Sequence, residues 1–475
     1  MAKFKMLSWL QPSATTDGTK LKRLSLSNLS SPRRRKREEL PVQDKTLPRQ
    51  SRLTELVTKI AVETAKLEDY VRDEGFGVDT PDLPPRLQMS RQEVIWAAKE
   101  LESLVKGPRE SLQWAVWSYI DTLSLQIIYS YGIAQLVPLD TSITLSQLER
   151  KTSLDATNLA RVLRHAMTKK IFREDSPGLI SHTPASRLLV QDDLLKDWVG
   201  FNAEECFPAA AHVLEALRTH PEATSMTESG FNYAFGTVGM EPMFATLARD
   251  PDRARRMGRA MASFSSTKGY EVSYFVDGYD LADVDDRAGT FVDVGGSHGF
   301  VCVELARRWP RMSFIVQDLA STVESAPKPI CDDETIASRI RLQKHDFFEE
   351  QPVKGADVYF YRWIFHNYPT PSAINLLKKL TPSLKPGSRI LINDHCLRAP
   401  GCEPPWDERL IRGMDMQMLA VLNAQERDEG QFRALFEAAD RRFVFVGVRR
   451  FAGCLMAVVE AVWEPWAVEE MGVAG

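Results

Sequence analysis

The spacing of hydrophobic residues changes once along the chain. From about residue 51 to 285, apolar residues recur every three to four positions, which is the period of amphipathic helices. From about 286 onward, short apolar runs alternate with helix-like stretches, which is typical of a parallel sheet with helices on both faces. The runs predict strands at 290–294, 313–317, 340–344, 356–361 and 388–394, with a closing pair near 442–448 and 453–460.

The helical half contains a smaller pattern of its own. Long amphipathic helices are predicted around 115–135 and 205–220. Between them, Thr144 and Gln147 have the spacing of a capping box, and Asp155 precedes a second short helix. The buried stripe of that helix is predicted to be Leu159, Val162, Leu163 and Ala166. A hairpin, REDSPGLISHTPAS, follows, and two short helices with a hairpin form a winged-helix pattern.

A winged helix raises DNA binding as an alternative function, through the exposed face of Arg161, Arg164 and His165. Residues 1–50 hold twelve Lys/Arg and four Asp/Glu, which is a net charge of +8. Since the whole chain has a net charge of −4, the remaining residues carry −12. An acidic body disfavours nucleic acid as its partner. We therefore favour the interpretation that this polar face is simply solvated, and keep DNA binding as the less favoured alternative.

Length and composition fit a two-domain protein with a tail. The chain has 475 residues, of which 44% are hydrophobic and 26% charged. Residues 1–50, rich in Ser, Lys and Arg, are predicted to be disordered. Their run PRRRKR (Pro32–Arg37) is interpreted as part of a solvated tail, with an import signal, a contact to an anionic surface or a transit peptide as alternatives.

The expected location is the cytoplasm. No run of eighteen apolar residues predicts a membrane span, and the N-terminus has no uninterrupted apolar segment of the secretory kind. Six cysteines are scattered without CxxC pairs. This pattern favours reduced thiols over a disulfide framework or a zinc site, so no metal is expected.

A glycine-rich turn follows the first strand of the second half. Gly295, Gly296, Ser297 and Gly299 separate the strand from a helix-like stretch that begins at Val301. A strand, a turn of small residues and a helix bring backbone N–H groups close to a nucleotide-like ligand. The turn lacks the GxGxxG pattern, and no second phosphate turn follows. A compact adenosine ligand without phosphates, such as S-adenosylmethionine, is therefore favoured over a dinucleotide.

Polar side chains end the next four strands. Asp318 comes nineteen residues after Gly299, the spacing of a carboxylate that accepts ribose hydroxyls. Asp346, beside the apolar Phe347, could accept the adenine amino group. The fourth and fifth strands end near Arg362, His366, Tyr368 and Asp394. Since ligands of parallel sheets bind at the carboxyl ends of strands, these residues together predict a nucleoside site with a histidine beside it.

Five segments taken together resemble a known family: FVDVGGSHG, VQDL, HDFF, YRWIFHNYP and MDMQMLAVLNAQER. They are similar to the plant-type, caffeate-like S-adenosylmethionine-dependent O-methyltransferases, in particular fungal members of secondary metabolism, over about 110–465. The resemblance implies an α/β protein, with an all-α winged-helix dimerisation and substrate-lid domain at 51–285 and a Rossmann-like, seven-stranded class I methyltransferase domain at 286–475. It also implies a homodimer, in which the helical domain lends residues to the partner's substrate pocket.

The resemblance also implies roles for single residues. His366 matches the catalytic base, flanked by Asp394 and Glu426, and Met418 and Asn423 match substrate-lining positions. The implied cofactor contacts are Asp293, Gly295, Gly296, Gly299, Asp318, Leu319, Asp346, Phe347, Arg362 and Tyr368. The sequence departs from the family at Asn367, where an Asp is usual, so a charge is lost but hydrogen-bonding capacity is kept.

The implied reaction is O-methylation of a hydroxyl, expected to be phenolic, on a small aromatic or polyketide-type metabolite. A phenol has a pKa of roughly 10 and is a poor nucleophile at neutral pH without a base, a task that suits an imidazole with a pKa of about 6.5. A carboxylate on the other ring nitrogen fixes the tautomer and stabilises the imidazolium. N- or C-methylation stays open as an alternative, because an amine or a carbanion could use the same donor.

Overall fold

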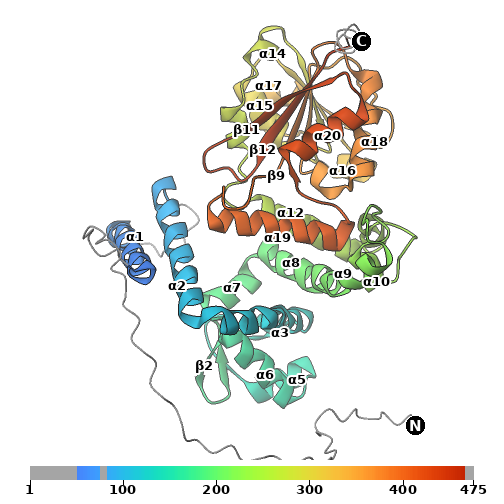
Figure 1. Cartoon of the computed structure of the whole chain (residues 1–475). Coiled ribbons are helices and arrows are strands. Elements are labelled where there is room, and N and C mark those ends of the chain that lie inside the picture. The colour runs from blue at the N-terminus through green and yellow to red at the C-terminus, as the bar shows by residue number, and fades with distance from the viewer. Residues whose placement is uncertain (1–50, 75–82, 466–475) are drawn as a thin grey trace, which may run out of the picture. The chain divides into compact units, whose positions relative to one another are not determined.

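The computed structural model describes residues 51–74 and 83–465. The predicted disordered extension at 1–50, with its Pro32–Arg37 run, lies outside the described residues. Figure 1 shows a layered α/β part above a group of helices, and both belong to the unit that begins at Arg52. Within the described ranges, no helix is long and apolar enough to cross a membrane.

A mixed seven-stranded sheet forms the centre of the C-terminal part. Its order is β11-β12-β8-β7-β4-β5-β6, in which β12 is antiparallel to both neighbours and the other pairs are parallel. The strands are β4 (Thr290–Val294), β5 (Ser313–Asp318), β6 (Ile340–Lys344), β7 (Val358–Arg362), β8 (Arg389–Asp394), β11 (Phe443–Arg450) and β12 (Ala457–Trp463). All seven predicted strands are present, and only their ends differ. The largest difference is in the last strand, which was expected from 453.

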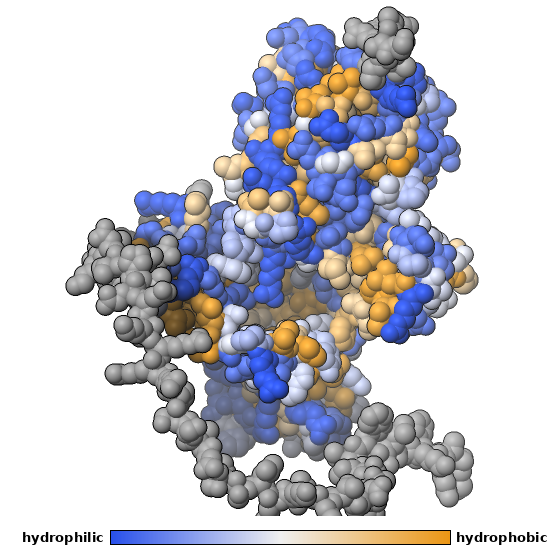
Figure 2. Space-filling view, viewed as in Figure 1, coloured by the Kyte–Doolittle hydropathy of each residue, from blue (hydrophilic) through white to orange (hydrophobic). Residues whose placement is uncertain are grey.

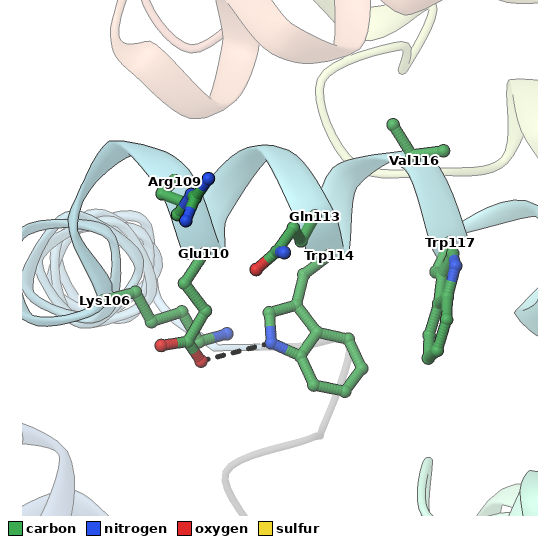
Figure 3. Close-up of a pocket in the computed structure, with 7 residues that line it drawn as sticks. All are labelled: Lys106, Arg109, Glu110, Gln113, Trp114, Val116 and Trp117. Carbon is green, nitrogen blue, oxygen red and sulfur yellow. Dashed lines mark hydrogen bonds between the residues drawn. The ribbon is translucent and has the colours of Figure 1, made fainter. Parts of the chain in front are cut away.

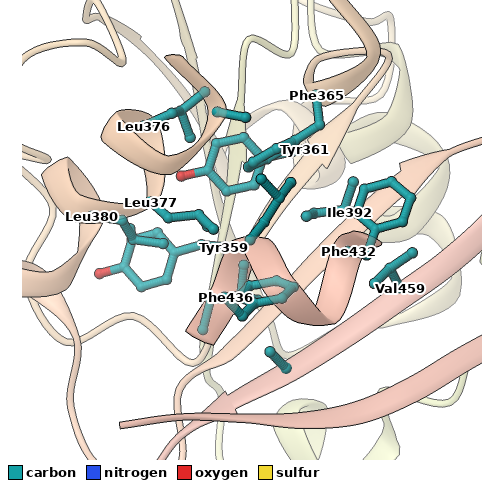
Figure 4. Close-up of a cluster of buried hydrophobic side chains, with 14 of the residues drawn as sticks. Tyr359, Tyr361, Phe365, Leu376, Leu377, Leu380, Ile392, Phe432, Phe436 and Val459 are labelled. Carbon is teal, nitrogen blue, oxygen red and sulfur yellow. The ribbon is translucent and has the colours of Figure 1, made fainter. Parts of the chain in front are cut away.

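The sheet is buried on both faces because its side chains alternate between two cores. Tyr359 and Tyr361 of β7 point into one core, where Figure 4 shows them packed with Leu376 and Leu377. Phe360, between them, points into the other core. The helices that cover the sheet are α13 (Ser273–Gly278), α14 (Ala282–Asp286), α15 (Phe300–Arg308), α16 (Ala320–Ser325), α17 (Glu334–Ala337), α18 (Thr370–Leu380) and α20 (Glu429–Ala439).

The part before residue 273 is almost entirely helical. Its helices are α1 (Arg52–Glu74), α2 (Pro85–Trp117), α3 (Tyr119–Ser130), α4 (Ile133–Leu136), α5 (Leu145–Thr152), α6 (Ala156–Met167), α7 (Pro184–Gln191), α8 (Asp193–Phe201), the π-helix η1 (Asn202–Cys206), α9 (Phe207–Thr219), α10 (Gly230–Phe235), α11 (Met243–Ala248) and α12 (Pro251–Ser265). A small sheet has the order β1-β3-β2, from β1 (Ile143–Thr144), β2 (Arg173–Ser176) and β3 (Leu179–Ser181).

Most local predictions for this part are confirmed, but His165, predicted on the exposed face of α6, is half-buried, with its Nδ1 3.2 Å from Ser124 Oγ. Thr144 and Gln147 form the capping box of α5, and the Asp155 side chain caps α6 by accepting two backbone N–H bonds. The predicted stripe of α6 packs inward, and the predicted hairpin is β2 and β3. On the outer face, the Arg164 guanidinium donates two hydrogen bonds to the Glu174 carboxylate of the hairpin, both of 2.8 Å.

Helix α19 (Pro405–Leu422) belongs to the C-terminal half by sequence but packs with the helical half. It follows the fifth strand of the sheet but packs with the helical part, as Figure 1 shows beside α12. Met418, Val421 and Leu422 share a buried cluster with Phe201 and Ala260. The neighbouring elements are β9 (Cys396–Leu397), β10 (Arg427–Asp428), and the short 3-10 helices η2 (Phe365–Asn367) and η3 (Thr381–Ser383).

Candidate active site

The glycine turn after β4 has a backbone that only small residues allow. Gly295 and Gly299 have φ of +75° and +77°, a region that favours glycine. A methyl group at Gly295 would lie 2.6 Å from Ile364 Cδ1, and one at Gly299 would lie 2.8 Å from Ile330 Cδ1. The backbone N–H groups of Gly295 and Gly296 both donate to the carbonyl of Gln317 on β5. The turn is therefore fixed, with no room for side chains at these positions.

Asp318, at the end of β5, is tied to this turn. One carboxylate oxygen accepts from the backbone N–H of Ser297 at 2.9 Å, and the other accepts from that of Leu319 at 2.8 Å. Each oxygen keeps a lone pair for a further donor. Leu319 is 55% exposed beside it, an apolar side chain that gains by being covered. The pair presents an acceptor and an apolar surface together.

The third strand end supplies a second polar and apolar pair. Asp346 is exposed, and its Oδ1 accepts from the backbone N–H of Phe348 at 2.9 Å. Phe347 meets the buried Tyr368 edge-on, with ring centroids 5.7 Å apart. A methyl group at Gly295 would be 3.6 Å from the Phe347 ring. Phe347 and the glycine turn therefore border the same space.

His366 lies in η2, directly after β7, and is buried against Glu426. Its Nδ1 is 3.0 Å from Glu426 Oε1, and only 8% of the residue is exposed. Because a carboxylate has only acceptors, Nδ1 carries the proton and Nε2 has a free lone pair. Asp394 does not bond the ring: its Oδ2 accepts from the backbone N–H of His366 at 3.0 Å. The two predicted flanking carboxylates are thus both present, in different roles.

The charges around His366 set its protonation. Burial lowers the pKa of His366, but the charge and hydrogen bond of Glu426, aided by Asp394, raise it above its ordinary value. Burial raises the pKa of Glu426, but the interactions with His366 and His395 outweigh this and lower it to about 2. Burial raises the pKa of Asp394. The histidine is therefore a stronger base than a free imidazole.

Arg427 holds the loop that carries His366. Its side chain is 1% exposed and donates to the backbone carbonyls of Phe365 and Tyr368, both at 2.7 Å. These two residues lie immediately before and two after His366. The guanidinium thereby fixes the loop at both ends and places a positive charge near Glu426.

Several predicted cofactor and substrate residues bond to the protein itself. The Arg362 guanidinium donates to the Asn393 side chain and to the Tyr270 carbonyl. Asn423 has φ of +50° at the end of α19 and donates through Nδ2 to the Ser225 carbonyl at 2.8 Å. Met418 is buried in the cluster of α19. Contacts of these three residues with a ligand stay predictions.

Asp293 packs against the glycine turn, whereas Asn367 bonds within the η2 loop. Asp293 is 1% exposed, and burial raises its pKa to about 7. A methyl group at Gly296 would lie 2.5 Å from the Asp293 carboxylate. Asn367 donates through Nδ2 to the Trp363 carbonyl at 2.9 Å. Asn367 thus uses its amide within the η2 loop.

Comparison with known proteins identifies the family of the chain. Residues 215–441 match the family model described as an O-methyltransferase domain. Chlorophenol O-methyltransferase of Trichoderma longibrachiatum is 60% identical over 429 residues, which cover 88% of this chain and 92% of that protein. The chain belongs to the O-methyltransferase family. A second member, O-methyltransferase gsfB of Penicillium aethiopicum, is 32% identical over 424 residues. The aligned residues cover 87% of the methyltransferase described here and 99% of gsfB.

Solved structures share the fold of this methyltransferase. The crystal structure of OxaC in complex with sinefungin and meleagrin superposes with a TM-score of 0.70 at 22% identity, covering 87% of this chain and 99% of that chain. The structure of LepI in complex with SAM superposes with a TM-score of 0.64 at 19% identity, covering 85% and 100%. At these identities the likeness shows the α/β fold alone.

Sequence reasoning missed three residues of the methyltransferase site. His395 is fully buried, with its Nδ1 3.2 Å from Glu426 Oε1, and its Nε2 is 3.0 Å from the Tyr270 hydroxyl. The ring of Trp363 has its centroid 5.0 Å from those of both His366 and His395. His395 directly follows a strand end and could have been found there. Tyr270 comes from a distant loop, and nothing in its local sequence marks it.

Proposed function

We propose that the protein transfers a methyl group from S-adenosylmethionine to a phenolic hydroxyl of a small aromatic molecule, with His366 as general base. The observation that carries the proposal is the buried His366–Glu426 pair, 3.0 Å apart, directly after a strand of the sheet whose neighbour bears the glycine turn. This arrangement supplies a proton acceptor beside a nucleoside-shaped site, which a hydroxyl acceptor requires.

The donor site fits the cofactor. The glycine turn keeps side chains out of the space bordered by Phe347, and Asp318 has lone pairs left for two ribose hydroxyls. The exposed side chain of Leu319 offers an apolar cover for a flat base. When bound, S-adenosylmethionine supplies a methyl group on a sulfonium, which is already activated for displacement. The chain's own task is to align the acceptor and remove its proton.

His366 performs the proton transfer in this proposal. Its Nε2 lone pair accepts the phenolic proton as the hydroxyl oxygen attacks, and the resulting imidazolium is stabilised by Glu426 through Nδ1. Asp394 holds the backbone of the histidine in place. The raised pKa of His366 favours proton removal from a phenol, whose own pKa of roughly 10 is higher still.

An aromatic acceptor is supported by a row of rings that begins beside the base. Trp363 lies against His366, and Phe264 packs against Trp363 with centroids 5.9 Å apart. Trp198 stacks on Phe264 at 5.2 Å. Rings of this kind favour a flat aromatic partner. The name of the Trichoderma relative points the same way, so we propose phenols, including chlorophenols, as acceptors.

The alternatives find less support. DNA binding through α6 needs a free basic face, but the Arg164 guanidinium is engaged by Glu174. An amine that is already unprotonated attacks the methyl group without a base, so the buried His366–Glu426 pair favours a hydroxyl acceptor. We also infer a cytosolic location, because all six cysteines are free.

We further propose that the helical part is a winged-helix dimerisation domain and that two chains form a homodimer. The second half of α2 has a group of exposed large apolar side chains: Leu104, Val105, Leu112, Trp114, Val116 and Trp117. Figure 3 shows Trp114 and Trp117 projecting from the same side of the helix into a hollow, with Glu110 bonded to the Trp114 indole N–H at 3.2 Å. Figure 2 shows apolar patches breaking a largely hydrophilic surface. Large exposed apolar patches mark interaction sites.

The function is tested by methyl transfer and by binding. Purified protein with S-adenosylmethionine and a monochlorophenol should yield the methyl ether, detected by mass spectrometry. Calorimetry should show binding of S-adenosylmethionine and of its demethylated product, and Asp318→Ala should weaken both by roughly tenfold or more, as expected when a charged hydrogen-bond acceptor is lost. Asp286→Ala, at an exposed aspartate in α14, is the control. Absence of ether with phenols, or methylation of amines alone, would contradict the proposal.

The dimer is tested by light scattering at micromolar concentration. The wild-type mass should be twice that of the chain, about 107 kDa from the 53.7 kDa sequence. A Trp114→Ser, Trp117→Ser double variant should dissociate. Met240→Ser removes an apolar side chain that is 68% exposed elsewhere and should leave the dimer intact. A monomeric wild type would refute the dimer while leaving the assignment of the active site unaffected.

A further inference from the structure

Glu426 lies between two imidazoles rather than one. Nδ1 of His366 is 3.0 Å from its Oε1, and Nδ1 of His395 is 3.2 Å from the same oxygen. His395 is fully buried and Glu426 is 2% exposed, so water does not screen either contact. The N–H of His395 is not aligned on the oxygen, which makes this contact the more oblique of the two. Such contacts often tighten when ligands bind.

Tyr270 selects one tautomer of His395. Since Glu426 offers only acceptors, a neutral His395 places its proton on Nδ1 and leaves a lone pair on Nε2. That nitrogen is 3.0 Å from the Tyr270 hydroxyl, which donates to it. Burial raises the pKa of Tyr270, so the hydroxyl keeps its proton. In the neutral form Nε2 of His395 thereby accepts from Tyr270, and its Nδ1–H faces Glu426.

We propose that His395, held by Tyr270, is a positioning residue that weakens the stabilisation of protonated His366 by Glu426. The inference rests on the proposed role of His366 as base. An N–H beside a carboxylate oxygen stabilises its negative charge. The same carboxylate stabilises the protonated form of His366, so sharing it with His395 weakens that effect. The second imidazole thereby lowers the pH at which the base loses its proton.

The other charged groups around the pair come from separate elements. Asp415 of α19 accepts from the backbone N–H of Glu426 at 2.9 Å, Asp394 ends β8, and Arg427 lies in β10. They act on His366 or Glu426 whichever residue stands at 395, so a substitution there changes one contribution alone. The expected change has a definite sign: without the His395 N–H, the charge of Glu426 is stabilised by fewer neighbours, interacts more strongly with His366 and raises the pKa of that histidine.

The test is the pH dependence of kcat/KM with S-adenosylmethionine and a monochlorophenol. In His395→Leu the midpoint of the rising limb should move to higher pH by about half a unit or more, as expected when a donor to the charged carboxylate is lost. His395→Asn, whose amide N–H₂ lies near the Nδ1 position, should restore the wild-type midpoint. Tyr270→Phe should shift it in the same direction by less, because His395 stays near Glu426.

The control is a second buried histidine. His182 is 4% exposed and bonds to Ser186 and to the Val137 carbonyl, remote from the site. His182→Leu should lose stability without moving the midpoint. An unmoved midpoint in His395→Leu overturns the inference, and if that variant does not fold, an unmoved midpoint in Tyr270→Phe does so. A wild type that methylates no phenol would instead overturn the proposed function.

Discussion

Replacement of Arg427 by alanine is the sharpest test of how the base is held. The guanidinium is 1% exposed and is bonded to the carbonyls of Phe365 and Tyr368, on either side of His366. Alanine leaves both carbonyls buried without these donors and removes the positive charge near Glu426. The variant therefore affects the stability of the fold and the geometry of the site together.

The size of the effect follows from these contacts. Each carbonyl left without its donor costs roughly 1–3 kcal/mol. Two such carbonyls account for about 2–6 kcal/mol, and the contribution of the nearby charges of Asp394 and Glu426 overlaps with this rather than adding to it. We expect Arg427→Ala to lower the free energy of unfolding by about 3–5 kcal/mol. Since a misplacement of about 1 Å can cost 10²-fold in rate, kcat should fall by about that factor in the folded fraction.

The assay is urea unfolding followed by circular dichroism, combined with kcat under saturating substrates. Arg307→Ala is the matched control, because Arg307 pairs with Glu304 at 2.7 Å but is 55% exposed, and such pairs contribute roughly 0–1 kcal/mol. Arg427→Lys should be intermediate, since an ammonium cannot span both carbonyls as a guanidinium does. An Arg427→Ala protein as stable and active as Arg307→Ala would refute the reasoning.

Three further predictions concern the site. His366→Ala should lower kcat by ~10²–10⁴-fold and leave the affinity for S-adenosylmethionine, measured by calorimetry, nearly unchanged. Glu426→Gln should lower kcat less. Loss of cofactor binding in His366→Ala would instead mean that the histidine is structural. Because the pKa of His366 is raised and that of Glu426 is about 2, kcat/KM should rise with pH through one pKa above 6.5, with no second acid limb between pH 4 and 6. Gly295→Ala should weaken the cofactor by about tenfold or more, since its methyl group meets Ile364, whereas Gly387→Ala, at φ +79° in open space, should not.

The sheet could be predicted from sequence because its strands carry their own evidence. The run 290–294 is buried on both sides and ends in a glycine turn, so its identity and approximate bounds follow from local pattern. The ends of the strands are less well defined by the apolar pattern. The strand expected from 453 begins at Ala457, because Gly453 takes a φ of +80° in a turn that the apolar pattern does not reveal.

The site could be predicted as far as its residues lie at strand ends or in family motifs. His366 and Glu426 are brought together, as the resemblance implied, although sixty positions separate them. Tyr270 could not be found, because only tertiary packing brings its hydroxyl to His395. The partners of Arg362 were also hidden, since a guanidinium that ends a buried strand can serve a ligand or a neighbouring carbonyl.

The position of α19 has a consequence for how the protein folds. Met418, Val421 and Leu422 fill a cluster with residues some two hundred positions earlier, while Glu426 follows on the same segment. A protein truncated to its residues from 286 onward would leave this apolar face open to water and would be prone to aggregate. The two halves should therefore unfold in one cooperative transition, with equal calorimetric and van't Hoff enthalpies. Evolution could exchange neither half alone without also rebuilding the segment that carries the carboxylate of the base.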